Sequence, residues 1–412
     1  MHPFATYVLR SYYKATGWNE DNLYANFTRS SNAVLDFSVP RGLHFSISKS
    51  PNTLFQTTYS MNALPSLNGS VGYIFTSCEL DIKSSKNVRF KDMVDRFKVY
   101  DQPLRPVPKP EEFFAGDRVD TRDYLLYGRL YVPTGRLDAL YSTRLSSTLQ
   151  ALVAAISDPR ADVRQSQSTS SPRNLMLSLQ HDTGRWCTEY TYSAEDSMVG
   201  VRMLHNFGKL VDESGSATLA SRRGGMKRID EEDAMEGGLK GRISAGAEVY
   251  FSAKEKSAGV STGIRFTTLP DATPPSFQPP TESSSTSALP SSFSSSCSPH
   301  VSQPATTITA LFNPMVGYIS GAYTARVSRD LSLSSRFDFN VYSYESEWTL
   351  PTSPYGVTGV VKARASTSND IALLWEGRLK NVLVGLGVAS NLSSGTKPIK
   401  SFGLELSYFS SG

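Results

Sequence analysis

Apolar and polar residues alternate along most of this 412-residue chain, and this alternation is the strongest constraint on its fold. In the stretch LSLSSRFDFNVY, the apolar positions are Leu331, Leu333, Phe337, Phe339 and Val341. Because successive side chains of a β-strand point to opposite faces, a period of two places all five on one face. The pattern predicts strands with one apolar and one polar face, and therefore an all-β protein.

The same alternation recurs in segments of about 9–11 residues, which is the length of a membrane-spanning β-strand. The clearest segments lie at 242–254, 331–341, 369–380, 381–390 and 401–408. Weaker segments lie near 33–39, 43–49, 53–61, 70–77, 124–132, 139–147, 148–156, 174–181, 186–192, 198–206, 259–268, 316–327 and 357–366. Together they predict roughly seventeen to nineteen strands, with about nineteen as our estimate.

Apolar runs long enough for a membrane-spanning helix are missing from the sequence. The longest is ALVAAI, at 151–156, whereas a spanning helix needs about 18–20 apolar residues. The other structure that satisfies every backbone polar group in lipid is a closed barrel. We therefore expect a porin-like transmembrane β-barrel, with aromatic residues near the strand ends.

Four stretches interrupt the strand pattern, at 84–123, 157–173, 207–240 and 270–309. We expect all four to be polar loops outside the membrane. The Ser/Pro-rich stretch 270–309 is expected to be disordered. Because similar strands resume after each loop, residues 33–412 are expected to form one barrel.

Two short segments have helical spacing. Residues 1–32 are expected to be an N-terminal amphipathic segment, whose apolar residues follow a helical period until Gly17. A cleaved mitochondrial presequence is the alternative for this segment. The second stripe consists of Phe90, Met93, Val94 and Phe97. It either docks a partner or a membrane surface, or packs on its own loop or the barrel rim.

Charge and cysteine content narrow the possible functions. With 42 basic and 38 acidic residues, the net charge of +4 gives no reason to expect nucleic acid binding. The cysteines Cys78, Cys187 and Cys297 lack the paired spacing of a zinc site or a disulfide framework, so we expect reduced thiols and no metal.

Motifs of catalysis are weak in this sequence. GVSTG, at 259–263, matches the nucleophile elbow, but Ser261 lies within an alternating strand. The histidine that follows it, His300, lies in the Ser/Pro-rich stretch. We expect Ser261 to face the inside of the barrel, and we expect neither a catalytic site nor a cofactor.

Basic residues outnumber acidic residues on the face expected to point inward. The basic set is Arg265, Arg326, Arg336, Lys362, Arg364 and Arg378, and the acidic set is Glu248, Asp338, Glu376 and Glu405. Such an excess is typical of an anion-selective pore. Alternatively, these side chains form hydrogen bonds across a filled lumen.

The chain ends in SFGLELSY, followed by four residues. Ser401, Gly403, Leu406 and Tyr408 have the order polar, glycine, hydrophobic, hydrophobic, which resembles the β-signal of mitochondrial outer-membrane barrels. An unpaired edge strand can be captured by another sheet edge, so a terminal strand is suited to recognition during insertion. We expect these four residues to act in biogenesis.

Two longer stretches carry a more specific resemblance. MHPFATYVLRSYYKATGWNEDNLYANFTRSSNAVLDFSVPRGL, at 1–43, and SRDLSLSSRFDFNVYSYESEW, at 328–348, resemble the fungal mitochondrial distribution and morphology protein 10 family. The resemblance implies a barrel of about nineteen strands in the mitochondrial outer membrane, with an N-terminal segment near the lumen.

The resemblance also implies partners. One set is the ER–mitochondria encounter structure, which works at contact sites in lipid exchange and in mitochondrial shape and inheritance. The other is the sorting and assembly machinery, where the family aids late assembly of the outer-membrane translocase. Membrane lipid surrounds such a barrel.

Tyr73 and Phe75 lie on the apolar face of their strand, where they contact either lipid or a partner protein. We take them as candidate partner-binding residues of an anchor and docking platform. The main alternative is a metabolite pore like the voltage-dependent anion channel. A soluble all-β binding protein is a third possibility.

Overall fold

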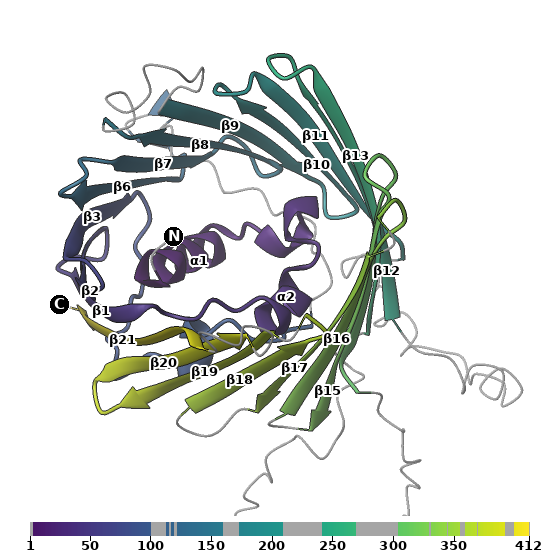
Figure 1. The fold of residues 1–412 in the computed structure, drawn as a ribbon. Helices are drawn as coiled ribbons and strands as arrows, with labels where there is room; N and C mark the ends of the chain where they lie inside the picture. The colour runs from purple at the N-terminus through teal and green to yellow at the C-terminus, as the bar shows by residue number, and fades with distance from the viewer. Residues whose placement is uncertain are drawn as a thin grey trace, which may run out of the picture.

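The computed structural model describes residues 3–99, 113–114, 117–118, 122–159, 173–208, 241–268, 304–328, 331–343, 345–354, 359–368, 370–391 and 399–411. Nineteen strands form one closed sheet (Figure 1). These are β1 (Gly42–Ser50), β2 (Phe55–Leu64), β3 (Asn68–Thr76), β6 (Tyr124–Val132), β7 (Leu137–Arg144), β8 (Leu149–Ser157), β9 (Arg173–Asp182), β10 (Trp186–Ser193), β11 (Met198–Asn206), β12 (Gly241–Ser252), β13 (Ser257–Thr268), β14 (Thr306–Asn313), β15 (Tyr318–Ser328), β16 (Leu331–Asn340), β17 (Glu345–Pro354), β18 (Gly359–Ser366), β19 (Asp370–Leu379), β20 (Val382–Asn391) and β21 (Ile399–Ser411). A separate two-stranded pair consists of β4 (Phe113–Phe114) and β5 (Asp117–Arg118).

The barrel closes where its first strand meets its last. β1 pairs with β21 in parallel, from Gly42 opposite Gly403 to Ser50 opposite Ser411. The other neighbouring strands pair antiparallel. An odd number of strands in up-and-down order requires one parallel joint, and it falls here. The predicted all-β barrel of about nineteen strands is confirmed.

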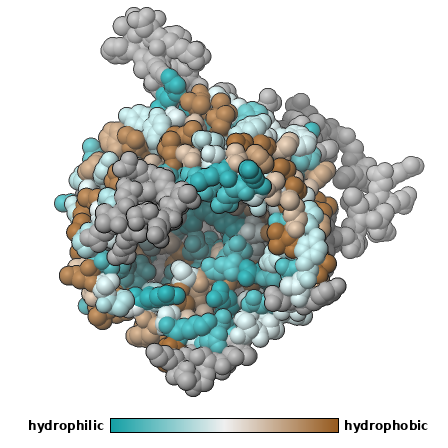
Figure 2. Space-filling model, turned by 45° about the horizontal axis from the view of Figure 1, so that its top comes forward, coloured by the Kyte–Doolittle hydropathy of each residue, from teal (hydrophilic) through white to brown (hydrophobic). Residues whose placement is uncertain are grey.

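The two faces of the wall differ as the alternation predicted. In β1, Ile47 is 57% exposed on the outer face, whereas its neighbours Ser46 and Ser48 are 3% and 1% exposed on the inner face. Figure 2 shows hydrophilic residues around the hollow of the barrel and hydrophobic residues on the outer wall. An outer wall of this kind suits a lipid environment. Within the described ranges, no helix is long and apolar enough to cross a membrane.

One predicted strand is not a strand in the structure, and two strands of the structure were not predicted. The segment 33–39 is not a strand, because α2 (Arg29–Leu35) continues past position 33 and buries both Val34 and Leu35. Two strands, β14 and β17, had no predicted counterpart. β14 begins at Thr306, inside the stretch 270–309 that was expected to be disordered, and β17 carries Pro351 and Pro354, residues that are uncommon inside a sheet.

The N-terminal segment lies inside the barrel (Figure 1). It contains α1 (Pro3–Thr16), the short 3-10 turns η1 (Glu20–Asn22) and η2 (Tyr24–Asn26), and α2. α1 ends at Thr16 and is followed by Gly17, whose φ of +70° is a conformation that glycine adopts readily. The helix predicted here is confirmed, and the barrel wall begins only at Gly42.

Part of the first long insertion also returns into the barrel. Residues 77–98, which contain the one-turn helix α3 (Phe90–Met93), bury Leu80, Ile82 and Val88 in one cluster with α1. Residues 84–98 of this segment belong to the predicted loop 84–123, and for them the prediction of a loop outside the membrane is corrected. Val94 and Phe97 of the predicted stripe are 7% and 0% exposed, so these two residues of the stripe pack within the protein. Most of the remainder of 84–123 and most of 157–173, 207–240 and 270–309 lie outside the described residues.

Candidate functional site

The site is the filled lumen together with the terminal strand. We call residues 3–41 and 77–98 the plug. α1 packs its apolar face on the inner wall, where Phe4, Val8 and Tyr12 are buried to 2%, 0% and 1% exposure. The wall contributes Ile74, Leu125, Tyr127 and Phe409 from β3, β6 and β21 to the same cluster. Side chains of this size each gain about 1.5–3 kcal/mol from full burial, so α1 is held mainly by the hydrophobic effect.

Arginines from the wall bind the backbone of the plug. Each bond runs from a guanidinium to a main-chain carbonyl oxygen. The pairs are Arg144 with Thr16, Arg265 with Phe27 at 3.2 Å, Arg326 with Phe97 at 3.5 Å, Arg364 with Leu35 at 3.2 Å, and Arg378 with Lys86 at 3.0 Å and with Val88. Carbonyls at helix ends and in irregular segments lack intrahelical donors, and these side chains supply them.

One plug carboxylate bridges two wall strands. Asp36 accepts a hydrogen bond of 2.7 Å from Arg336 of β16, and it lies 3.9 Å from Arg364 of β18. Arg336 also pairs with Asp338 at 2.9 Å. Lys362, the remaining inward base, pairs with Glu376 at 3.3 Å. The inward basic residues therefore bind the plug or inward acidic residues, which is the second of the two roles that the sequence left open.

The middle of the plug is held by polar side chains and lies against a glycine of the wall. Asn22 donates to Asp182 at 2.7 Å and accepts from Asn206 at 2.6 Å. Tyr24 hydrogen-bonds Ser261 at 3.1 Å. A Cβ on Gly246 would lie only 2.4 Å from the ring of Tyr24. This wall position therefore admits no side chain. Ser261 faces inward as predicted.

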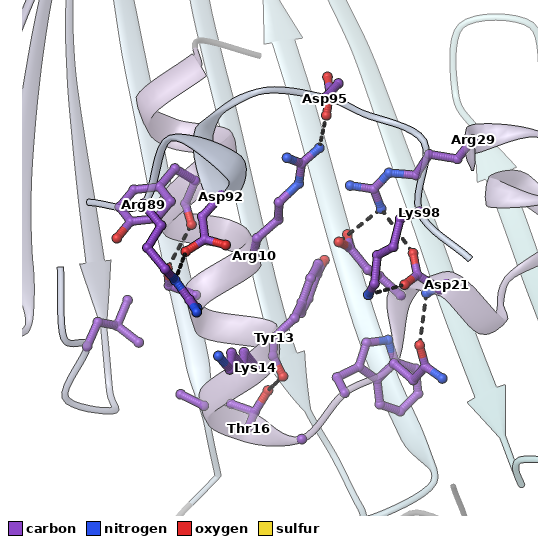
Figure 3. Close-up of a pocket in the computed structure, with 18 of the residues that line it drawn as sticks. Arg10, Tyr13, Lys14, Thr16, Asp21, Arg29, Arg89, Asp92, Asp95 and Lys98 are labelled. Atoms are coloured by element: carbon purple, nitrogen blue, oxygen red, sulfur yellow. Dashed lines mark hydrogen bonds and ion pairs between the residues drawn. The ribbon is translucent and has the colours of Figure 1, made fainter. Parts of the chain in front are cut away.

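A cavity of about 1300 Å³ lies between α1, η1 and residues 79–98. Figure 3 shows its charged side chains in pairs, of which Arg10 with Asp95 and Lys98 with Asp21 join the two plug segments. Arg10 contacts Asp95 at 2.5 Å, Lys98 contacts Asp21 at 3.6 Å, Arg29 contacts Glu20 at 2.9 Å, and Arg89 contacts Asp92 at 3.1 Å. These charges tie the plug together. The described part of the chain holds no group of three metal-ligating side chains.

Burial changes the titration of the tyrosines on α1. It raises the pKa of Tyr13 to about 12, and it raises the pKa values of Tyr7 and Tyr12 above their ordinary value. Removal of water from around the phenol disfavours the charged phenolate. These tyrosines are therefore neutral at physiological pH and act as apolar side chains.

The four predicted signal residues divide between the two faces of β21. Leu406 and Tyr408 point outward, and Tyr408 is 40% exposed. Ser401 and Gly403 point into the lumen, where a Cβ on Gly403 would lie 2.3 Å from the carbonyl oxygen of Pro40. The structure gives Gly403 a steric reason to be glycine. The role of the four residues in biogenesis stays a prediction.

Tyr73 and Phe75 lie on the outer face of β3. Tyr73 is 52% exposed, and its ring covers Gly128 of β6, where a Cβ would lie 2.8 Å from the ring. The ring of Phe75 lies 6.1 Å from that of Tyr124. Each aromatic therefore has a neighbour within the wall, and partner contact at these residues stays a prediction.

The sequence analysis missed the residues that seat the plug. Asp36 of the plug binds the wall, and Gly387 and Phe409 of the wall contact the plug, but none of the three was singled out. One signal was present for Gly387, which lies in VLVGLGVAS, where glycines occupy two successive inward positions of a strand. Inward glycine marks a place where another segment comes close to a strand.

Comparison with known proteins agrees with this architecture. The chain matches the family described as Mitochondrial distribution and morphology protein 10 over residues 1–356 and 352–411. The chain belongs to this family. A protein of that name from Postia placenta is 69% identical, one from Laccaria bicolor is 67% identical, and all of each chain is covered. A relative from Cryptococcus neoformans is 38% identical, with 99% of each chain covered.

Family membership supports a role in mitochondrial distribution and morphology. It also identifies a mitochondrial protein, and the β-barrel fold is consistent with the outer membrane. The family name describes an effect on the organelle and no reaction, which suggests a non-enzymatic role. The filled lumen is thus a feature of an organelle-shaping barrel.

Proposed function

We propose that this protein is an anchor and docking platform of the mitochondrial outer membrane that two complexes share. One is the ER–mitochondria encounter structure, where it supports lipid exchange, mitochondrial shape and inheritance. The other is the sorting and assembly machinery, where it aids late assembly of the outer-membrane translocase. Its partition between the two would set the amount of each complex.

The observation that carries this proposal is the filled lumen. Arginines of five wall strands, β7, β13, β15, β18 and β19, bind carbonyl oxygens of the plug. Because the inward charges of this barrel bind its own chain, the surfaces available to partners are the outer wall and the loops. Family membership and the apolar outer wall, on which Ile47 is 57% exposed, add support for the membrane setting.

The test is a mild-detergent pull-down from fungal mitochondria, with partners identified by mass spectrometry. The tag is inserted within residues 270–303, away from the terminal strand. Recovery of subunits of both the tether and the assembly machinery is the expected result. Recovery of the barrel with neither set of subunits would overturn the proposal.

Contact at the outer wall is tested in the same assay with Tyr73→Ala and Phe75→Ala. Tyr323→Ala is the control, because Tyr323 is also an outward aromatic, 50% exposed, but lies on β15. Selective loss of one partner set with the β3 variants supports contact there. Equal recovery from all three variants assigns Tyr73 and Phe75 to lipid.

The second candidate function is an anion-selective metabolite pore. The cavity of about 1300 Å³ beside α1 favours it. The bonds between the inward arginines and the plug weigh against it, because these charges do not line an open path. A planar-bilayer recording separates the two functions, since a stable anion-selective conductance from the full chain would support the pore.

A further inference from the structure

The segment that leads into the first strand lies against the last two strands. We call residues 36–41 the linker. Gly387 of β20 and Gly403 of β21 are paired in the ladder and both face the lumen. A Cβ on Gly403 would lie 2.3 Å from the oxygen of Pro40, and one on Gly387 would lie 2.8 Å from Pro40 Cδ. This glycine pair is a seat that admits the linker only because both side chains are absent.

Apolar contacts fix the linker at this seat. Phe37 is 8% exposed and packs with Ala372 and Leu374 of β19, which are 3% and 5% exposed. Val39 and Ala389 pack against the same cluster. The ring of Phe37 also lies 5.5 Å from the guanidinium carbon of Arg364. Wall residues therefore hold the linker at Phe37 and Val39 as well as at Pro40.

The other end of β21 contacts α1 from inside the barrel. Phe409 is 2% exposed, and its ring centroid lies 5.5 Å from that of Phe4 and 6.1 Å from that of Tyr7. Its carbonyl oxygen accepts a hydrogen bond of 2.9 Å from the backbone N–H of Ser85. The lumen face of the last strand is thus contacted by the plug near both of its ends.

The strand that these contacts hold belongs to the closing joint. β21 pairs with β1 in parallel, and parallel pairing is slightly less stable per residue than antiparallel pairing. The linker is covalently continuous with β1 and rests on β21, so the Pro40 contact with Gly403 ties the first strand to the last. Both glycines lie on the β21 side of the joint, so opening the joint would draw the linker, which continues into β1, away from its seat.

We infer that the plug is a latch on the closing joint of the barrel. Once seated, it keeps the two strands paired. Gly403, a residue of the predicted terminal signal, is the position where the latch engages. The inference rests on the fold and does not depend on the proposed partners.

Hydrogen exchange of the full chain in lipid nanodiscs tests the latch. Gly387→Ala fills the seat without changing the terminal strand. Gly385→Ala is the matched control, because it lies on the same strand and face but a Cβ there meets no atom closer than Glu405 Cβ at 3.6 Å. We expect backbone amides of β1 and β21 to exchange about tenfold faster in Gly387→Ala, with amides of β12 and β13 unchanged.

The control decides the outcome. Unchanged exchange at the joint in Gly387→Ala, or the same increase in Gly385→Ala, would show that seating of the linker does not hold the joint. Either result overturns the latch.

A second variant covers the case in which Gly387→Ala does not fold. The double variant Phe4→Ala/Tyr7→Ala leaves every wall residue intact and removes the rings that pack on Phe409. Lys14→Ala, on the same helix, is its control. Faster exchange at 407–411 in the double variant alone supports the latch, and exchange equal to that of Lys14→Ala overturns it.

Discussion

The two helices of the plug are held in the lumen by different chemistry. α1 has 14 residues and buries a continuous apolar face, on which Val8 is 0% exposed. α2 has 7 residues, and although Val34 and Leu35 are 0% exposed, its C-terminal end depends on polar contacts of Asp36 and the Leu35 carbonyl. Burial of apolar area is non-directional, whereas the contacts of α2 need particular side chains from β16 and β18. α1 is therefore the more stably bound end of the plug, and α2 is the end that substitution of a single polar residue can release.

Cysteine labelling distinguishes the two ends in two matched chains, one for each reporter. Cys78 packs against the α1 cluster, so its reaction with a thiol reagent reports release of α1. Val34→Cys, made in a chain with the native cysteines replaced by serine, reports release of α2 because Val34 is fully buried.

The largest effect is expected from Tyr12→Ala. Tyr12 is 1% exposed in the α1 cluster, and truncation of a buried aromatic side chain costs about 3–5 kcal/mol. Labelling of Cys78 is expected to rise by orders of magnitude, with a much smaller change at Val34→Cys. Equal increases at both reporters would contradict the comparison, because they would mean that the plug leaves as one unit.

Alkaline pH is expected to release the same end. Burial raises the pKa of Tyr13 to about 12, while a tyrosine in the released helix titrates near ~10. The contribution of Tyr13 is complete below pH ~10 and is lost as the pH rises from ~10 to 12, up to about 2–3 kcal/mol. Labelling of Cys78 with iodoacetamide between pH 8 and 12, compared with a Tyr13→Phe variant, measures this loss. A pH profile that Tyr13→Phe leaves unchanged would contradict the assignment.

The barrel could be predicted because its wall obeys a repeated local rule. Each strand places apolar residues outward and polar residues inward, as Ile47 and its neighbours Ser46 and Ser48 show. The rule failed where composition hides it. Pro351 and Pro354 concealed β17, and the Ser/Pro-rich stretch concealed the start of β14 at Thr306.

The plug could be predicted only in part, because its position depends on partners distant in sequence. The apolar face of α1 was visible, but the bond from Arg336 to Asp36 joins residues 300 positions apart. Nothing local to Arg336 distinguishes a pore-lining charge from one that binds a plug. Gly403 was recognised by pattern, and its steric role required the position of Pro40.

Asp36→Ala is expected to release α2 with a moderate effect. The variant loses the 2.7 Å bond to Arg336, but Arg336 keeps its pair with Asp338, so the cost is about 1–2 kcal/mol. Labelling of Val34→Cys should rise, while labelling of Cys78 should change by less than about twofold. Asp92→Ala is the control, since its pair with Arg89 lies at the other end. A larger rise at Cys78 than at Val34→Cys would reverse the comparison.

Lys98→Ala should have the smallest effect, because the charge of Lys98 is not what holds this part of the plug. Its ammonium is 3.6 Å from Asp21 and its side chain is 56% exposed, so the pair contributes about 0.5 kcal/mol or less. The backbone carbonyl of Lys98 accepts a hydrogen bond from the Ser30 hydroxyl, and this bond survives the substitution. Ser30→Ala removes that bond and should raise the labelling of Val34→Cys more than Lys98→Ala does. The opposite order would mean that charge, and not the buried backbone contact, joins residues 77–98 to α2.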